Sequence, residues 1–138
     1  MLTLCKTLTK SDGRAFPMAG VISGTASLLG QSLVTAQCNP CEVRSVEETI
    51  LTAAEERFRG QFEQRWLLQP PVGTRKCFEI WPRAKQPGEK PLTIMEGLSP
   101  APNVIASGVQ AHWGSNPAMA QRFVAKIVER IKEKQARH

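Results

Sequence analysis

Cysteine and histidine are the side chains of this 138-residue sequence with the most evident capacity for chemistry. Among its four cysteines, Cys38 and Cys41 stand in a Cys-x-x-Cys spacing. Such a pair can act as a redox couple or as half of a zinc site. A zinc site would need further ligands, for which Cys77 and His112 are the candidates. The sequence has no second Cys-x-x-Cys and no His-x₃₋₅-His, so the usual zinc spacing is absent, and we predict no metal and no cofactor.

The redox interpretation of the Cys38/Cys41 pair also lacks its usual setting. In redox proteins with this spacing the first cysteine caps a helix, whose N-terminus lowers the thiol pKa. Here the next helix start that we predict lies at Ser45, beyond both cysteines. We therefore expect no activated thiolate, and we interpret Cys5 and Cys77, which lie in strand-like segments, as small buried hydrophobic residues.

Other catalytic constellations are missing from the sequence. His112 is the one internal histidine and stands beside Trp113, with no G-x-S-x-G elbow, P-loop or G-x-G-x-x-G motif in the chain. The acidic residues gather between 45 and 69, where they alternate with arginines at salt-bridging intervals such as Glu55 to Arg59. That arrangement is typical of a solvated surface, so we favour a binding protein over an enzyme.

The charge distribution supports a binding role. The net charge is +6, and the last 22 residues hold six lysines and arginines against two glutamates. Four cations recur at intervals of four residues along this segment and form a basic ridge: Arg122, Lys126, Arg130 and Lys134. A second cluster combines cations with an aromatic residue: Arg75, Lys76, Trp81, Arg83, Lys85 and Lys90. The sequence therefore predicts a small basic protein that contacts the nucleic-acid backbone through a cationic hairpin loop and a basic C-terminal helix.

A docking role is the alternative, because the same positive field would attract an acidic protein surface. In that case the chain is an assembly module, a homo-oligomer or a structural subunit of a larger complex. No apolar run approaches the length of a membrane-spanning helix, and no secretory signal is recognisable at the N-terminus, so we expect a cytoplasmic protein that does not enter membranes.

The first third of the chain reads as strands. Residues 2–9 alternate leucine with polar residues, and Asp12-Gly13 is a two-residue hairpin turn. The returning arm would cover residues 15–23, with Pro17 confining it to an edge. Residues 24–37 are ambiguous between helix and strand, and we favour a strand because two glycines weaken a helix.

The next segment predicts a helix over about 46–68. Ser45 and Glu48 have the spacing of a capping box, and Pro70-Pro71 would end the helix. An apolar residue then recurs every four positions: Ile50, Ala54, Phe58, Phe62 and Trp66. This stripe is typical of a helix that faces the core.

The last part of the chain predicts strands and a second helix. The strands would cover residues 74–81 and 91–95, followed by one or two short strands between 103 and 113. Ser115-Asn116-Pro117 is a helix start, and an apolar face follows it: Ala120, Phe123, Val124, Ile127, Val128 and Ile131. We expect Phe123 and Ile127 to be buried, together with Phe58 and Phe62.

These elements combine into an α+β fold in a single domain over residues 1–138, with a weak seam at 70–74. The order is strands, helix, strands, helix. We expect a mostly antiparallel sheet with two amphipathic helices on one face, because each helix must bury its apolar stripe.

Overall fold

The structure is a computed structural model that describes residues 2–28, 39–62, 66–82 and 93–137. Within these ranges it is mostly β, with eleven strands and one α-helix. The first strands are β1 (Cys5–Thr9), β2 (Ala15–Pro17), β3 (Ile22–Leu28), β4 (Asn39–Ser45), β5 (Arg57–Phe62) and β6 (Trp66–Gln69). The later strands are β7 (Phe78–Pro82), β8 (Ile94–Glu96), β9 (Leu98–Ala101), β10 (Val104–Ala106) and β11 (Val109–Ala111). The helical segments are the short 3-10 turns η1 (Leu2–Leu4) and η2 (Trp113–Ser115) and the helix α1 (Pro117–Gln135).

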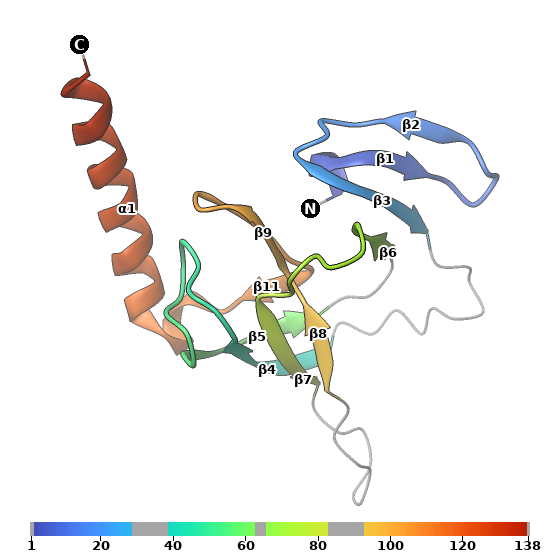
Figure 1. Cartoon of the computed structure of the whole chain (residues 1–138). Coiled ribbons are helices and arrows are strands. Elements are labelled where there is room, and N and C mark those ends of the chain that lie inside the picture. The colour runs from blue at the N-terminus through green and yellow to red at the C-terminus, as the bar shows by residue number, and fades with distance from the viewer. Residues whose placement is uncertain (1, 29–38, 63–65, 83–92, 138) are drawn as a thin grey trace, which may run out of the picture.

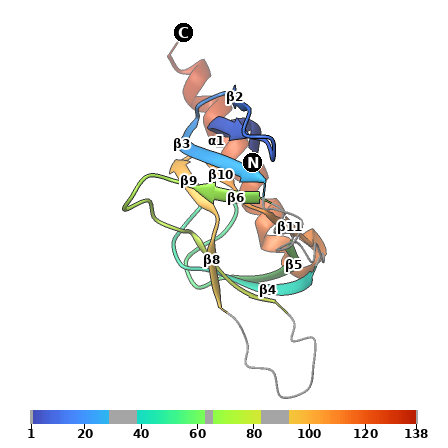
Figure 2. The same cartoon turned by 90° about the vertical axis from the view of Figure 1, so that its right-hand side faces the viewer.

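The strands form three sheets. A four-stranded sheet has the order β2-β1-β3-β6, a five-stranded sheet has the order β11-β5-β4-β7-β8, and β9 pairs with β10. The four-stranded sheet and the five-stranded sheet occupy opposite ends of the molecule in both views (Figures 1 and 2). The helix α1 stands at one side, and its C-terminal end points away from the five-stranded sheet (Figure 1).

The predicted N-terminal hairpin is confirmed in its centre. β1 pairs antiparallel with β2 around the Asp12-Gly13 turn, where Asp12 accepts a hydrogen bond from the backbone N–H of Arg14 at 3.0 Å. The returning arm ends at Pro17 on the sheet edge, earlier than predicted. β3 then crosses over and pairs parallel with β1, so the sheet is not purely antiparallel.

The helix predicted over 46–68 is wrong. Ser45 ends β4 rather than capping a helix, and its hydroxyl donates to the carbonyl oxygen of Glu47 at 2.8 Å. Its Oγ also lies 2.7 Å from Oγ1 of Thr52, which lies 2.8 Å from Oγ1 of Thr49. These buried hydroxyls satisfy one another within an irregular loop, so the polar residues of the presumed helix start instead stabilise a connection between two strands.

The apolar part of that presumed helix forms β5 instead. Its side chains alternate strictly between exposed and buried, with Phe58 and Phe62 facing inward. An interval of four residues is also an even number, so it places both side chains on one face of a strand as well. β5 pairs along its length with β4, which the helix prediction had not anticipated.

Two groups of buried side chains make the core. The larger one fills the inner face of the five-stranded sheet, where the rings of Phe58 and Phe78 meet edge to face with centroids 5.4 Å apart. Its members are Cys41, Val43, Phe58, Phe62, Cys77, Phe78, Ile80 and Met119. The smaller one joins the four-stranded sheet to the β9/β10 pair through Ile22, Leu98 and Ala106. The predicted burial of Phe58 and Phe62 is confirmed, although they lie on a strand.

The remaining strands follow the prediction more closely. β7 and β8 pair antiparallel, as expected for residues 74–81 and 91–95, although both are shorter. Between β8 and β9, Gly97 has a φ of 76° and passes so close to the core that a Cβ there would lie 2.8 Å from Phe78 Cδ2. Glycine therefore permits the turn that leads from one sheet into the next.

The fold class predicted from the sequence is therefore corrected. The described residues contain one helix rather than two, so the order strands-helix-strands-helix does not hold. In the described ranges no helix is long and apolar enough to cross a lipid bilayer.

Candidate docking surface on the C-terminal helix

The helix α1 begins where the sequence places it. Asn116 is the N-cap, and its side-chain oxygen accepts a hydrogen bond from the backbone N–H of Ala118 at 3.1 Å. Pro117 occupies the first helical position, where its missing N–H costs nothing. Lys132 and Lys134 stand in the last turn and complement the helix dipole. Local sequence alone thus accounts for this helix.

A cluster of polar contacts attaches the start of α1 to the rest of the molecule. Arg122 donates from Nη1 to the carbonyl oxygen of Leu51 at 2.8 Å and to Oε2 of Glu56 at 2.7 Å. The other carboxylate oxygen of Glu56 accepts from Asn116 Nδ2 at 3.0 Å, and Ala53 N–H donates to Oε2 at 2.7 Å. Glu56 therefore holds both the cap and the second turn of the helix.

The electrostatics of Glu56 agree with that role. Burial by itself raises the pKa of this carboxyl group, because the charged form loses water. The hydrogen bonds from Ala53 and Asn116 and the charge of Arg122 outweigh burial, so the pKa is lowered overall. Glu56 is thus ionised at neutral pH, where its carboxylate holds α1 in place and does not act as a proton donor.

Beyond this attachment the apolar stripe of α1 faces outward, which corrects the predicted burial of Phe123 and Ile127. Met119 is the one buried residue of the helix. The exposed fractions are 38% for Phe123, 58% for Val124, 43% for Ile127, 44% for Val128 and 51% for Ile131. We call these five residues the α1 apolar face. The predicted partner, a second helix packed on the same sheet, did not form, so the described elements leave this face uncovered.

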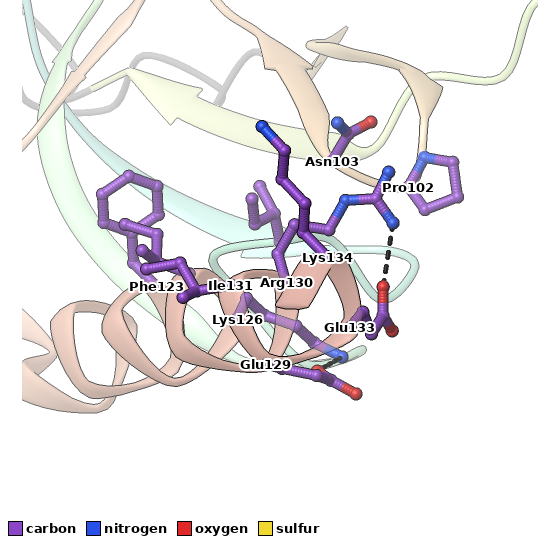
Figure 3. Close-up of a pocket in the computed structure, with 11 residues that line it drawn as sticks. Pro102, Asn103, Phe123, Lys126, Glu129, Arg130, Ile131, Glu133 and Lys134 are labelled. Atoms are coloured by element: carbon purple, nitrogen blue, oxygen red, sulfur yellow. Dashed lines mark hydrogen bonds and ion pairs between the residues drawn. The ribbon is translucent and has the colours of Figure 1, made fainter. Parts of the chain in front are cut away.

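A groove runs beside the α1 apolar face. It has a volume of about 670 Å³ and lies between α1, Ile50 of the β4–β5 loop and the turn at Pro102 that joins β9 to β10. Figure 3 shows Phe123 and Ile131 on its helix side. Arg130 and Lys134 also line it from the helix. Both apolar and charged side chains therefore line the groove.

Most of the predicted basic ridge is engaged in ion pairs. Arg122 pairs with Glu56, Lys126 Nζ lies 3.3 Å from Glu129 Oε2, and Arg130 Nη1 lies 2.9 Å from Glu133 Oε2 (Figure 3). Within the described residues Lys134 has no acidic partner. The glutamates thus neutralise much of the ridge, as expected from the sequence, and three of its four cations have a carboxylate beside them.

The second basic cluster is only partly described. Arg83, Lys85 and Lys90 lie outside the described residues. Arg75 is exposed and Lys76 half-buried in the segment before β7. Trp81 is half-buried, and the guanidinium groups of Arg44 and Arg57 lie 5.9 and 5.4 Å from the centre of its ring.

These contacts bear on whether a nucleic-acid base could stack on the ring of Trp81. Each arginine beside the ring makes a cation–π contact with it. Arg44 also bonds Glu79, with Nε 2.9 Å from Oε2. The ring of Trp81 is therefore already in contact with two arginines, one of which is held by Glu79.

The candidate thiol and metal residues are only partly described. Cys38 lies outside the described residues, whereas Cys41 and Cys77 belong to the core and His112 is exposed. In the described ranges no group of three or more histidine, cysteine, aspartate or glutamate side chains could hold a metal ion.

The thiols of Cys5 and Cys77 differ from the low-pKa thiols of redox enzymes. Burial, with the nearby charges of Glu96 and Glu47, raises the pKa of Cys77 to about 12. Burial likewise raises the pKa of Cys5. The predicted burial of Cys5 and Cys77 is confirmed, and neither thiol is activated.

Sequence reasoning identified the apolar residues of α1 but assigned them to the core. It also missed Ile50 and Pro102 as neighbours of α1, because Ile50 was assigned to the stripe of the helix predicted over 46–68 and Pro102 lies in a turn without a periodic pattern. The Ser45/Glu48 spacing misled the prediction, because it indicated a second helix that would share the core with α1. Without that helix, α1 has no amphipathic helical counterpart among the described residues.

No family model matches this chain. The chain is 30% identical over 132 residues to cobyrinate a,c-diamide synthase from two strains of Leptospira interrogans, of serovars copenhageni and Lai. The match covers 94% of this chain and 27% of each enzyme. The chain thus spans about a quarter of the length of the curated relatives that it matches.

Proposed function

We propose that this chain is a protein–protein assembly module that docks through the α1 apolar face. The partner is a larger chain that resembles the remaining three quarters of a cobyrinate a,c-diamide synthase. The observation that carries this proposal is the exposure of five large apolar side chains along one helix face. Contiguous apolar patches on a protein surface mark interaction sites, because water contact with each such side chain is unfavourable.

The energetics favour such docking. Burying a large aliphatic or aromatic side chain fully is worth about 1.5–3 kcal/mol relative to leaving it exposed. The residues of the face are between 38% and 58% exposed, so each retains a substantial part of that free energy for a partner. The groove beside Ile50 and Pro102 would receive side chains from the partner, as the pockets of protein interfaces do.

The comparison supports the choice of partner. A segment that makes up about a quarter of a larger protein commonly contacts the rest of it through an interdomain interface. The α1 apolar face is the surface of this chain that we assign to that contact. On this proposal the chain supplies one part of an assembly of the cobyrinate a,c-diamide synthase type.

The test is complementation in trans. The Leptospira enzyme is prepared without the residues that match this chain. Complex formation with this chain is measured by size-exclusion chromatography with light scattering. Restored activity is measured as formation of cobyrinate a,c-diamide. We expect a complex of defined stoichiometry with this chain. Ile127→Asp should weaken the complex at least tenfold, because it places a charge at the centre of the apolar face.

The matched control is Ala125→Asp, which lies about 160° around α1 from Ile127 at 100° per residue. It introduces the same charge into an exposed position of the same helix. Equal weakening by both variants, or no complex with a truncated enzyme whose circular dichroism shows it to be folded, would overturn the proposal.

The net charge of +6 supports a second proposal, that the chain binds the nucleic-acid backbone. At the end of α1 the cations Lys132, Lys134 and Arg137 have no acidic partner among the described residues. Salt dependence separates the two proposals, since phosphate binding weakens steeply as salt rises and apolar docking changes little. A titration of a labelled oligonucleotide that shows no binding at low salt would remove this second proposal.

A further inference from the structure

A second concave surface lies where the exposed side of β5 meets β11 and the turn η2. The exposed residues Arg59 and Gln61 alternate with the buried ones along β5. Gln110 of β11 is the register partner of Gln61, and the backbone N–H of His112 donates to the carbonyl oxygen of Arg59 at 2.8 Å. These four polar side chains line a cleft of about 500 Å³.

The walls of this cleft are fixed by the turn η2. Ser115 Oγ accepts a hydrogen bond from the backbone N–H of Arg59 at 2.9 Å and donates to the carbonyl oxygen of His112 at 2.6 Å. A Cβ at Gly114 would lie 3.1 Å from His112 Cε1, so the imidazole lies directly against this glycine. The strand and the turn that carry the two basic side chains are thus joined before any ligand arrives.

The charges of the cleft are one-sided. None of its described lining residues is acidic. On the same strand, Arg57 has Glu42 at 3.5 Å and Trp81 beside its guanidinium. Arg59, by contrast, has no carboxylate within salt-bridging distance in the described part of the chain. The two arginines of one strand face therefore differ: Arg57 pairs with Glu42, whereas Arg59, which stands opposite Glu42 in the register of β4 with β5, makes no ion pair in the described part of the chain.

We propose that this cleft binds a small molecule through an oxyanion, a carboxylate or a phosphate, held by Arg59 with His112 beside it. A guanidinium pairs with two oxygens of either group at once, which fixes the orientation of the ligand. The amides at Gln61 and Gln110 lie across the cleft and contact the uncharged part of the ligand. The cleft volume falls in the range of small-molecule sites, about 300–1,000 Å³.

The experiment is isothermal titration calorimetry of the intact chain with inorganic phosphate and, separately, with glutarate. The two probes distinguish a phosphate site from a carboxylate site. We expect saturable binding of at least one probe, which Arg59→Gln weakens at least tenfold. Arg57→Gln removes the same charge from the same strand face two residues away and should change the affinity less than twofold.

Thermal unfolding of both variants shows whether each is folded. Equal losses from Arg57→Gln and Arg59→Gln would mean that the ligand responds to general charge, and would overturn the proposal. Absence of saturable binding of both probes to the wild-type chain would overturn it as well. Ile127→Asp should leave this binding unchanged, so the cleft and the docking surface can fail independently.

Discussion

The inner residues of β5 and the apolar face of α1 come from the same kind of sequence pattern and end in opposite environments. Phe58 and Phe62 stand four residues apart and are 3% and 7% exposed. Phe123 and Ile127 also stand four residues apart, but are 38% and 43% exposed. The spacing of four residues thus identifies which side chains share a face. It does not tell whether the segment is a helix or a strand, nor whether another element covers that face.

Neighbouring residues decide between the two outcomes. Gly60 lies between Phe58 and Phe62, and a Cβ added at this position would come within 2.7 Å of the carbonyl oxygen of Gln110. Glycine disfavours a helix there and lets β11 approach closely. In α1, Asn116 and Pro117 nucleate a helix with no such contact along its outer face. Strand pairing buries the first pattern, whereas no described element covers the second.

The largest expected difference between the two regions is in the free energy of unfolding. Phe62→Ala should lower it by about 3–5 kcal/mol, because it leaves a cavity in the larger core group. Phe123→Ala should cost less than about half as much, since this ring is partly in water already. Urea unfolding followed by circular dichroism measures both. If the two costs were equal, the α1 apolar face would be covered in the isolated chain, and the comparison would fail.

The contacts of Glu56, which attach α1 to the rest of the molecule, should have a smaller and pH-dependent effect on the free energy of unfolding. The folded pKa of Glu56 is lowered, so ionised Glu56 stabilises the fold above its unfolded pKa of about 4.3, and this stabilisation is lost as the pH falls through the folded value. Glu56→Gln should therefore lower the free energy of unfolding by about 1–3 kcal/mol at pH 7, and this loss should shrink as the pH falls below the unfolded pKa.

The matched control for Glu56 is Glu48→Gln, in the same loop. Glu48 is exposed and has no ion pair with any described residue. Its substitution should change stability by less than about 0.5 kcal/mol at any pH. A loss at Glu56 that is independent of pH would mean that shape, and not charge, attaches the helix.

The fold could be predicted from the sequence where local chemistry decides the structure. The Asp12-Gly13 turn and the start of α1 at Asn116-Pro117 follow from the preferences of one or two residues, and the strands of the β7/β8 pair follow from the strand-like patterns of residues 74–81 and 91–95. The parallel pairing of β1 with β3 could not be predicted, because it depends on contacts between segments that no local pattern links. The loop after Ser45 was misread because its serine and threonines bond one another rather than a helix N-terminus.

The candidate sites were less accessible from the sequence than the fold. The residues of the α1 apolar face were found by their period, but their exposure depends on the absence of a covering helix in the described residues. The cleft at Arg59 and His112 was missed because its residues are brought together by the register of β5 with β11. Register is a property of pairing, which a single sequence does not reveal.

The smallest expected effect is the change in salt dependence when the cations of α1 are replaced. Comparing it with the same replacement in the loop at residues 83–90 tests the nucleic-acid proposal. Replacing Arg83, Lys85 and Lys90 together with alanine should make the slope of log affinity against log salt shallower by about two to three units for duplex DNA, since each phosphate contact contributes about 0.9. Replacing Arg122, Lys126 and Arg130 should change the slope by less than one unit, because Glu56, Glu129 and Glu133 already pair with them. Fluorescence anisotropy of a labelled oligonucleotide between low and moderate salt measures both slopes. A larger change from the helix variant would mean that DNA displaces the glutamates, and would make α1 a phosphate-binding element as well as an apolar one.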